Sequence, residues 1–153
     1  MAHRVIGVDA ASKKDFVFSC GAEHFIPLEG TESIPEAIKA LTGGLGAHAI
    51  LILTANNAAY ASSLDMLRFG GRVVCVGVPE GEPMPIKSAL PQLMIAKALS
   101  IVGVAVGDRK EAIECLDFAV GFPSISYLLL RFLRVIVSAA NSQISGLIAR
   151  IFD

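Results

Sequence analysis

Residues 4–9, Arg-Val-Ile-Gly-Val-Asp, form a short apolar run that ends on a carboxylate. A run of this kind, bounded by polar residues, predicts a buried strand. In a doubly wound parallel sheet, an acidic residue at the carboxyl end of a strand holds the ribose hydroxyls of a dinucleotide. Asp9 is therefore a candidate ribose ligand, and an ordinary strand-end or helix-capping aspartate is the alternative.

The position of this run in the chain bears on which strand it is. In the doubly wound fold, the acid lies about 20 residues after a glycine-rich phosphate loop. The printed sequence has only three residues before Arg4. We therefore expect the strand at residues 4–9 to be the second of the fold, with the chain beginning one strand late.

Strand and helix patterns alternate along the first 120 residues. Further strands are predicted at residues 24–27, 48–54, 72–79 and 100–106, and helices at residues 13–20, 32–41, 56–67, 93–98 and 109–120. The run at 48–54 is apolar on both faces, which is typical of a parallel sheet covered by helices on both sides. The alternation predicts an α/β fold, a doubly wound, mostly parallel sheet that lacks its first strand and glycine-rich turn.

Polar residues and glycines predict where the helices begin and the chain turns. Thr31 or Ser33 is expected to cap the second helix, and Asn56 or Asn57 the third. Two glycine pairs, at residues 43–44 and 70–71, are predicted to be turns rather than phosphate loops, because neither follows a strand and opens a helix.

The composition excludes several classes of function. The chain has 153 residues, of which 54% are hydrophobic, and a net charge of -1, so we expect a real core and no partner among nucleic acids or anionic membranes. The three histidines and three cysteines have no ligand spacing, which predicts no metal site and no disulfide, and the cysteines are expected to be packed. No secretory signal is evident, so a reducing cytoplasm fits best.

Several motifs follow one another in a recognisable order. Besides residues 4–9 they are Cys20-Gly-Ala-Glu-His-Phe25, Leu41-Thr-Gly-Gly44, Gly46-Ala-His-Ala49, Gly70-Gly-Arg-Val-Val-Cys-Val-Gly-Val-Pro79, Ile101-Val-Gly103 and the helix at 112–119. This series resembles the coenzyme domain of the medium-chain, zinc-type alcohol dehydrogenases, closest to the yeast and fungal branch. The resemblance spans about three quarters of the chain, up to residue 120.

The resemblance implies an NAD-linked interconversion of alcohols and aldehydes or ketones, with a small-molecule substrate and a catalytic zinc held by a separate domain. Asp9 would bind the adenosine ribose, and Lys13 or Lys14 would reach the same end of NAD. An acid there favours NAD, because it would repel a 2'-phosphate. A solvated helix start is the alternative for both lysines.

Five further positions match the family's cofactor site. Thr54 would lie beside the cofactor at the end of its strand, unless it is only a turn residue. The backbone groups of Val76, Val78, Val104 and Val106 would hold the nicotinamide carboxamide. Their side chains are expected to be core, and a backbone contact tolerates any apolar side chain.

The departures from the family imply a truncated dehydrogenase. The printed sequence contains no glycine-rich turn, no catalytic domain and no zinc ligands, so we assign neither catalytic nor metal-binding residues to it. We expect it not to catalyse the family's reaction alone. The alternatives are an inactive nucleotide-binding or dimerisation module, which would pair with another subunit through the edge strand at 100–106, and a non-functional gene product.

The predicted domain organisation is a partial NAD-binding domain at residues 1–121 and a divergent apolar tail at residues 122–153. Residues 134–139 could fill the vacant centre of the sheet as a strand, or residues 126–140 could form an amphipathic helix over exposed sheet. A membrane span is not expected, because Arg131 and Arg134 interrupt a short apolar stretch.

Overall fold

The computed structural model describes residues 4–120 of the chain. The chain divides into two compact units, Met1–Val106 and Gly107–Asp153. The described part of the second unit is helix α5, Arg109–Val120, whose bounds were predicted correctly. Both alternatives for the tail, the strand at 134–139 and the helix at 126–140, lie outside the described residues. Within residues 4–120, no helix combines the length and the apolar character that a membrane crossing requires.

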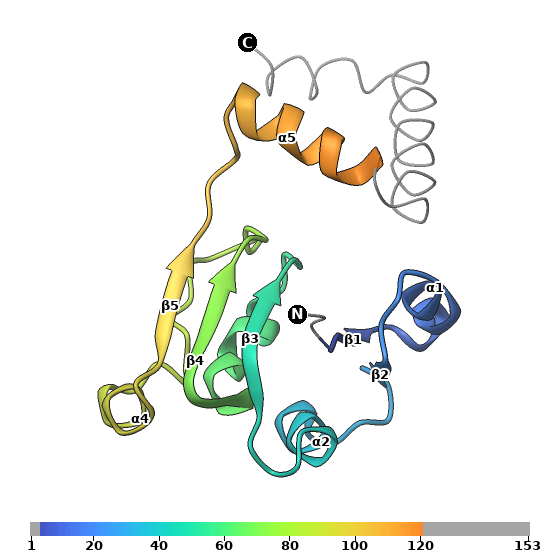
Figure 1. The fold of residues 1–153 in the computed structure, drawn as a ribbon. Helices are drawn as coiled ribbons and strands as arrows, with labels where there is room; N and C mark the ends of the chain where they lie inside the picture. Colours follow the sequence, from blue (N-terminus) through green and yellow to red (C-terminus); the bar gives the residue numbers. More distant parts are fainter. Residues whose placement is uncertain (1–3, 121–153) are drawn as a thin grey trace. The chain divides into compact units, whose positions relative to one another are not determined.

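The first unit contains two parallel sheets (Figure 1). One pairs β1, Ile6–Asp9, with β2, His24–Pro27, and the other orders β3, Ala47–Ile52, β4, Leu67–Cys75, and β5, Ser100–Gly103. The helical segments between them are η1 (Ala11–Lys13), α1 (Lys14–Ser19), α2 (Ile34–Leu41), α3 (Asn57–Ala61), η2 (Ser63–Met66) and α4 (Pro91–Lys97). The predicted α/β fold with parallel strands is confirmed.

The strand order also fits an incomplete doubly wound sheet. A complete sheet of this kind has the order 3-2-1-4-5-6. The observed orders β2-β1 and β3-β4-β5 correspond to 3-2 and 4-5-6, and β1 does not pair with β3. The position of strand 1 is therefore not taken by any strand within residues 4–120. β5 is the outer strand of its sheet, and subunit pairing through residues 100–106 stays a prediction.

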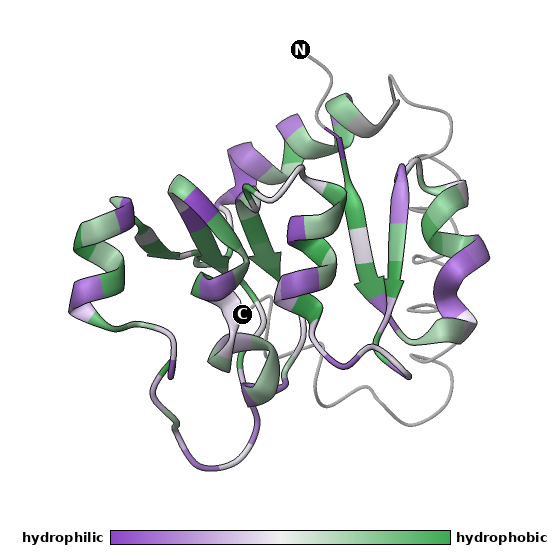
Figure 2. Ribbon diagram, turned by 90° about the horizontal axis from the view of Figure 1, so that it is seen from below, coloured by the Kyte–Doolittle hydropathy of each residue, from purple (hydrophilic) through white to green (hydrophobic). Residues whose placement is uncertain are grey.

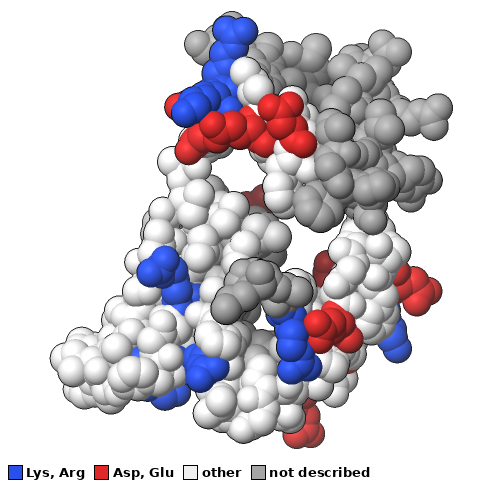
Figure 3. All heavy atoms as spheres, viewed as in Figure 1, with Lys and Arg blue, Asp and Glu red and all other residues white. Residues whose placement is uncertain are grey.

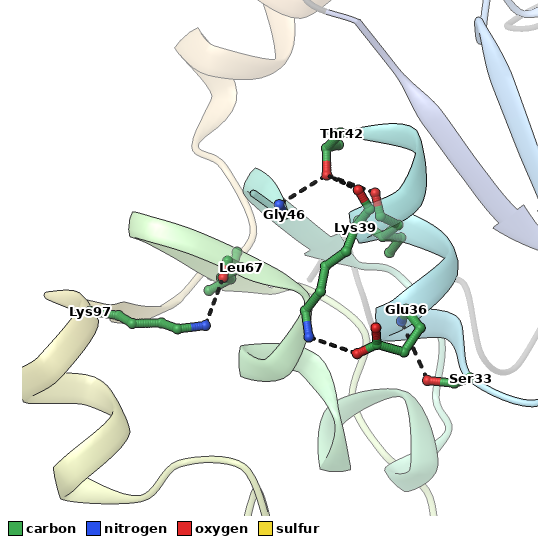
Figure 4. Close-up of polar contacts among 8 residues, drawn as sticks. Ser33, Glu36, Lys39, Thr42, Gly46, Leu67 and Lys97 are labelled. Atoms are coloured by element: carbon green, nitrogen blue, oxygen red, sulfur yellow. Dashed lines mark hydrogen bonds and ion pairs between the residues drawn. The ribbon is translucent and has the colours of Figure 1, made fainter. Parts of the chain in front are cut away.

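Side-chain hydrogen bonds fix both ends of α2, as Figure 4 shows. Ser33 is the cap, because its hydroxyl accepts from the Glu36 amide at 3.4 Å, whereas the alternative Thr31 donates to a carbonyl of β2. At the other end the Thr42 hydroxyl accepts from the Gly46 amide at 2.9 Å. This hydrogen bond closes the turn between the end of α2 and the start of β3.

The larger core lies on one face of the second sheet. Leu64 of η2, Leu67 and Val73 of β4 have no exposed surface, and Tyr60 of α3 and Leu99 pack with them. Figure 2 shows the strands as mainly apolar, whereas the helices carry hydrophilic residues along one side. Because burying these apolar side chains is favourable, it stabilises the packing of α3, η2 and α4 on the sheet.

A second core joins the two sheets. Ile38 of α2, Ile26 of β2 and Met66 of η2 are buried together, and Ile6 of β1 and Ile50 of β3 pack against them. Helix α2 therefore contacts both sheets and holds them in one packed unit.

The opposite face of β3 differs from the prediction. The sequence predicted helices on both sides of this strand, but Leu51 and Leu53 are 62% and 71% exposed. Uncharged atoms cover most of the surface over β3, β4 and β5 in Figure 3. The prediction of two covered faces is wrong for the described residues, because α3, η2 and α4 pack on the face that carries Val73.

The glycine pair at 70–71 also differs from the prediction, because it lies inside β4 rather than in a turn before the strand. The register of β3 and β4 changes from Ala47 opposite Leu67 to Ala49 opposite Arg72. The extra residues of β4 bulge out around Gly70, whose φ of 70° is the left-handed conformation that glycine adopts freely.

Candidate functional site

Asp9 ends β1, as predicted. Its side chain is exposed, and Oδ1 accepts a hydrogen bond from the Ala10 amide at 2.7 Å. The backbone carbonyl of Asp9 accepts from Leu28 at 3.0 Å, which holds the strand end against the segment after β2. One carboxylate oxygen thus fixes the turn, and the other remains available to bind hydroxyl groups.

Glu29 supports the same turn and was missed in the sequence. Its Oε2 accepts from the Ala11 amide at 2.7 Å, next to the amide that Asp9 binds. A glutamate 18 residues away along the chain gives no local sign of this contact. It places a second negative charge near Asp9, which would also disfavour a 2'-phosphate.

Lys13 and Lys14 follow Asp9 closely. Lys13 ends η1 and Lys14 begins α1, and both side chains are exposed. No ion pair within residues 4–120 engages either ammonium group. The structure therefore brings both lysines to the turn that presents Asp9, but it does not distinguish between them.

A cavity of about 340 Å³ lies where β4 and β5 end. It is lined by residues from α3, from the ends of both strands and from the following loop, namely Asn57, Tyr60, Cys75, Val76, Gly77, Val78, Pro79, Met84, Ile86, Gly103 and Val104. Cavities that bind small molecules begin at roughly this volume. It can hold one end of a dinucleotide rather than the whole molecule.

Three of the four predicted valines line this cavity, but they lie beyond the ends of the strands. β4 ends at Cys75 and β5 at Gly103, so the predicted extents of residues 72–79 and 100–106 are too long. Val76, Val78 and Val104 line the cavity from the segments that follow. Val106 does not line it and is 93% exposed.

These valines were expected to have core side chains, and that expectation is wrong for the described residues. Val76 is 41% exposed, Val78 81% and Val104 51%. The reason is that each lies at or beyond the end of the sheet, where the helices no longer cover the chain.

Thr54 approaches the cavity through its backbone. A Cβ placed on Gly77 would lie 2.7 Å from the Thr54 carbonyl carbon and closer still to its oxygen. Only glycine leaves room for this approach of the two segments. The exposed Thr54 side chain is not among the groups that line the cavity.

Tyr60 lines the cavity and was not singled out in the sequence. Its hydroxyl donates a hydrogen bond to the Gly77 carbonyl. Burial raises the pKa of this hydroxyl above its ordinary value, and the neighbouring Cys75 raises it further. Tyr60 therefore remains a neutral donor across the physiological pH range.

The start of α3 places Asn57 at the same cavity. Asn56, one of the two predicted caps, accepts from the Ala58 amide at 2.8 Å through its side chain. That leaves Asn57, which lines the cavity, to donate to the Glu80 carbonyl at 3.5 Å. The two adjacent asparagines could have indicated this position of Asn57, since only one of them can cap the helix and the other is left for another contact.

No group of three or more His, Cys, Asp or Glu side chains within residues 4–120 could hold a metal ion. The described histidines instead contact arginines, His24 with Arg4 at 3.0 Å and His48 with Arg68 at 2.8 Å. All three cysteines are free thiols, and Cys20 and Cys115 are exposed rather than packed, which corrects the sequence expectation.

Comparison with known proteins identifies the family of the chain. The profile of the zinc-binding dehydrogenases matches residues 1–121, more than three quarters of the chain. The chain belongs to the zinc-binding dehydrogenase family. The resemblance read from the motifs is therefore confirmed.

The curated relatives of the chain include alcohol dehydrogenases. Alcohol dehydrogenase 2 of Emericella nidulans is 50% identical over 126 residues, which cover 78% of this chain and 34% of the relative. An alcohol dehydrogenase of Schizosaccharomyces pombe is 34% identical over 77% of this chain and 33% of its own length. The chain thus spans about a third of the length of these relatives, which fits the predicted fragment of a larger dehydrogenase.

Solved structures show the same fold. An alcohol dehydrogenase from Thermotoga maritima superposes with a TM-score of 0.70 at 24% identity, over 83% of this chain and 36% of that one. A putative alcohol dehydrogenase from Sinorhizobium meliloti gives a TM-score of 0.63 at 33% identity, over 76% of this chain and 33% of that one.

Proposed function

We propose that this chain is the coenzyme-binding part of an NAD-dependent alcohol dehydrogenase. Asp9 would bind the adenosine ribose, with Lys13 or Lys14 near the same end of the cofactor. The observation that supports this best is the position of Asp9 at the carboxyl end of a parallel strand, in a chain of the zinc-binding dehydrogenase family.

The nicotinamide end would occupy the cavity at the ends of β4 and β5. Val76, Val78 and Val104 line that cavity, and their backbone groups would hold the carboxamide, while Gly77 lies against Thr54 in its wall. Val106 would complete the contacts to the carboxamide. When bound, NAD would supply the hydride acceptor, and these residues would orient it.

We infer that an alcohol or carbonyl substrate and the zinc that acts on it require residues outside 4–120, since no described cluster fits a metal. The chain alone is therefore expected to show no alcohol turnover, with or without added zinc. The free thiols support a reducing, cytoplasmic setting.

Titration of the full 153-residue chain with NADH, measured by isothermal calorimetry, tests the cofactor site. We expect a Kd of about 1 mM or tighter, and weaker binding of NADPH. Asp9→Ala should weaken NADH binding about tenfold or more, because hydrogen bonds to a charged group contribute roughly 1.5–3 kcal/mol. The control Asp65→Ala removes an exposed carboxylate of η2 and should bind NADH as the unchanged chain does.

Absence of NADH binding would overturn the proposal. Equal binding by Asp9→Ala and the unchanged chain would remove Asp9 from the site.

A further inference from the structure

We propose that Glu29 is a positioning residue for the adenosine end of the cofactor site, and that its charge adds to the discrimination against a 2'-phosphate. Glu29 would act on the turn that presents Asp9 rather than touch the cofactor itself. This inference rests on the proposed function, because that function assigns the ribose to Asp9.

The turn after β1 has two consecutive amides, and a different carboxylate binds each of them. Asp9 Oδ1 accepts from the Ala10 amide and Glu29 Oε2 from the Ala11 amide, both at 2.7 Å. Hydrogen bonds of this kind, in which the acceptor is charged, are roughly twice as strong as neutral ones. The bond from Ala11 reaches a residue 18 positions away, so it ties the turn to the end of β2.

The backbone on both sides of Glu29 is held in place. Asp9 pairs with Pro27 in the parallel register of β1 and β2, and the Leu28 amide donates to the Asp9 carbonyl at 3.0 Å. The Thr31 hydroxyl donates to the Pro27 carbonyl at 2.6 Å, which closes the loop after Glu29. The carboxylate of Glu29 therefore extends from a fixed part of the fold to the turn.

The conformation of this turn determines how Asp9 is presented. The Lys13 amide donates to the Ala10 carbonyl at 2.9 Å, so the same turn also begins η1. Without the bond to Glu29, one side-chain bond instead of two would hold the turn, which would then adopt more conformations in the free chain. Ordering them on binding costs affinity, because a preorganised site avoids that cost.

The two carboxylates also lie close together. Because they bind consecutive amides at 2.7 Å each, the two bonded oxygens lie within about 10 Å of one another. This is comparable to the Debye length, about 8 Å at physiological ionic strength. No ion pair within residues 4–120 engages Asp9 or Glu29. A 2'-phosphate bound at Asp9 would therefore be repelled by both charges.

Two ligands read the adenosine end alone, adenosine 5'-monophosphate and adenosine 2',5'-bisphosphate, each titrated into the full 153-residue chain and followed by NMR. Glu29→Gln keeps a side-chain oxygen that accepts from Ala11 but removes the charge. It should bind the monophosphate within about twofold of the unchanged chain and the bisphosphate about threefold more tightly. At about 1 M salt, where the Debye length is about 3 Å, the gain for the bisphosphate should disappear.

Glu29→Ala removes the hydrogen bond as well as the charge. It should bind the monophosphate about threefold more weakly than the unchanged chain. Amide hydrogen exchange in the free chain should show lost protection at Ala11, whereas Ala10, which is bonded to Asp9, should remain protected. Glu32→Gln is the matched control, because it removes one charge from an exposed position in the same loop and should leave both affinities unchanged.

Equal binding of both ligands by the two Glu29 variants and the unchanged chain would overturn this proposal and leave Asp9 in the site. Unchanged protection of Ala11 in Glu29→Ala would show that Glu29 does not hold the turn. If the unchanged chain bound neither ligand, the proposed function would fail instead, and exchange at Ala11 would still test the contact with Glu29.

Discussion

Replacing Gly77 by alanine should destabilise the first unit and distort the candidate cofactor cavity. The added Cβ would meet three backbone atoms, among them the Thr54 carbonyl carbon at 2.7 Å and the Leu53 carbonyl carbon at 2.8 Å. Backbone atoms cannot turn aside as a side chain can, so the two segments must separate. Forcing an extra carbon into a packed site costs about 1–3 kcal/mol.

Two hydrogen bonds of Gly77 add to the expected loss. Its amide donates to the Ile52 carbonyl at 2.8 Å, and its carbonyl accepts from Tyr60. Separation from Thr54 would strain both bonds. We therefore expect Gly77→Ala to lose stability toward the upper end of that range and to weaken NADH binding as well.

Gly103→Ala is the matched control. Gly103 lines the same cavity, yet a Cβ there would meet no atom within 4 Å. The free energy of unfolding of Gly103→Ala should differ from that of the unchanged chain by less than about 0.5 kcal/mol, as for most substitutions away from packed sites. Urea unfolding of the full chain, followed by circular dichroism, measures both variants. Equal stability of Gly77→Ala and Gly103→Ala would show that the close contact between Gly77 and Thr54 does not require a glycine.

Four further substitutions test other parts of the fold by the same unfolding assay. Leu64→Ala removes a side chain with no exposed surface and should cost about 2–5 kcal/mol, whereas Ile95→Ala, at an 81% exposed position, should cost less than about 0.5 kcal/mol. Tyr60→Phe removes the hydrogen bond to Gly77 and should cost about 1 kcal/mol at neutral pH. Since the folded chain raises the pKa of Tyr60, the unfolded chain ionises first above about pH 10, so stability should fall there, and less steeply in Tyr60→Phe. Ser33→Ala should cost about 0.5–1 kcal/mol, because the 3.4 Å cap bond is long; a stability equal to that of the unchanged chain would contradict the cap.

The sequence predicts the elements whose causes are local. β2 and α5 have the predicted bounds, His24–Pro27 and Arg109–Val120. Ser33 was one of two predicted caps, and a short polar side chain before an apolar helix carries that information within a few residues. Parallel strands follow from apolar runs at the spacing of βαβ units.

The strand ends depend on neighbours that the sequence does not reveal. The valines after Cys75 continue the strand pattern, yet β4 stops there because Gly77 meets Thr54 and the chain leaves the sheet. The exposure of Leu51 has the same kind of cause, since whether a helix covers a face is decided by distant residues. Glu29 was missed for this reason as well, because its bond to Ala11 exists only once β1 and β2 are paired.

We propose that Asp9 with the two lysines, and the valines after β4 and β5, bind opposite ends of one NAD molecule. NMR spectra of the full chain, titrated separately with adenosine 5'-monophosphate and with nicotinamide mononucleotide, test it most directly. We predict that the first ligand shifts the amides of Asp9 and Ala10, and the second those of Val76 and Val104. Shifts of neither pair, or of the same residues by both ligands, would show that these residues do not bind the two ends of NAD.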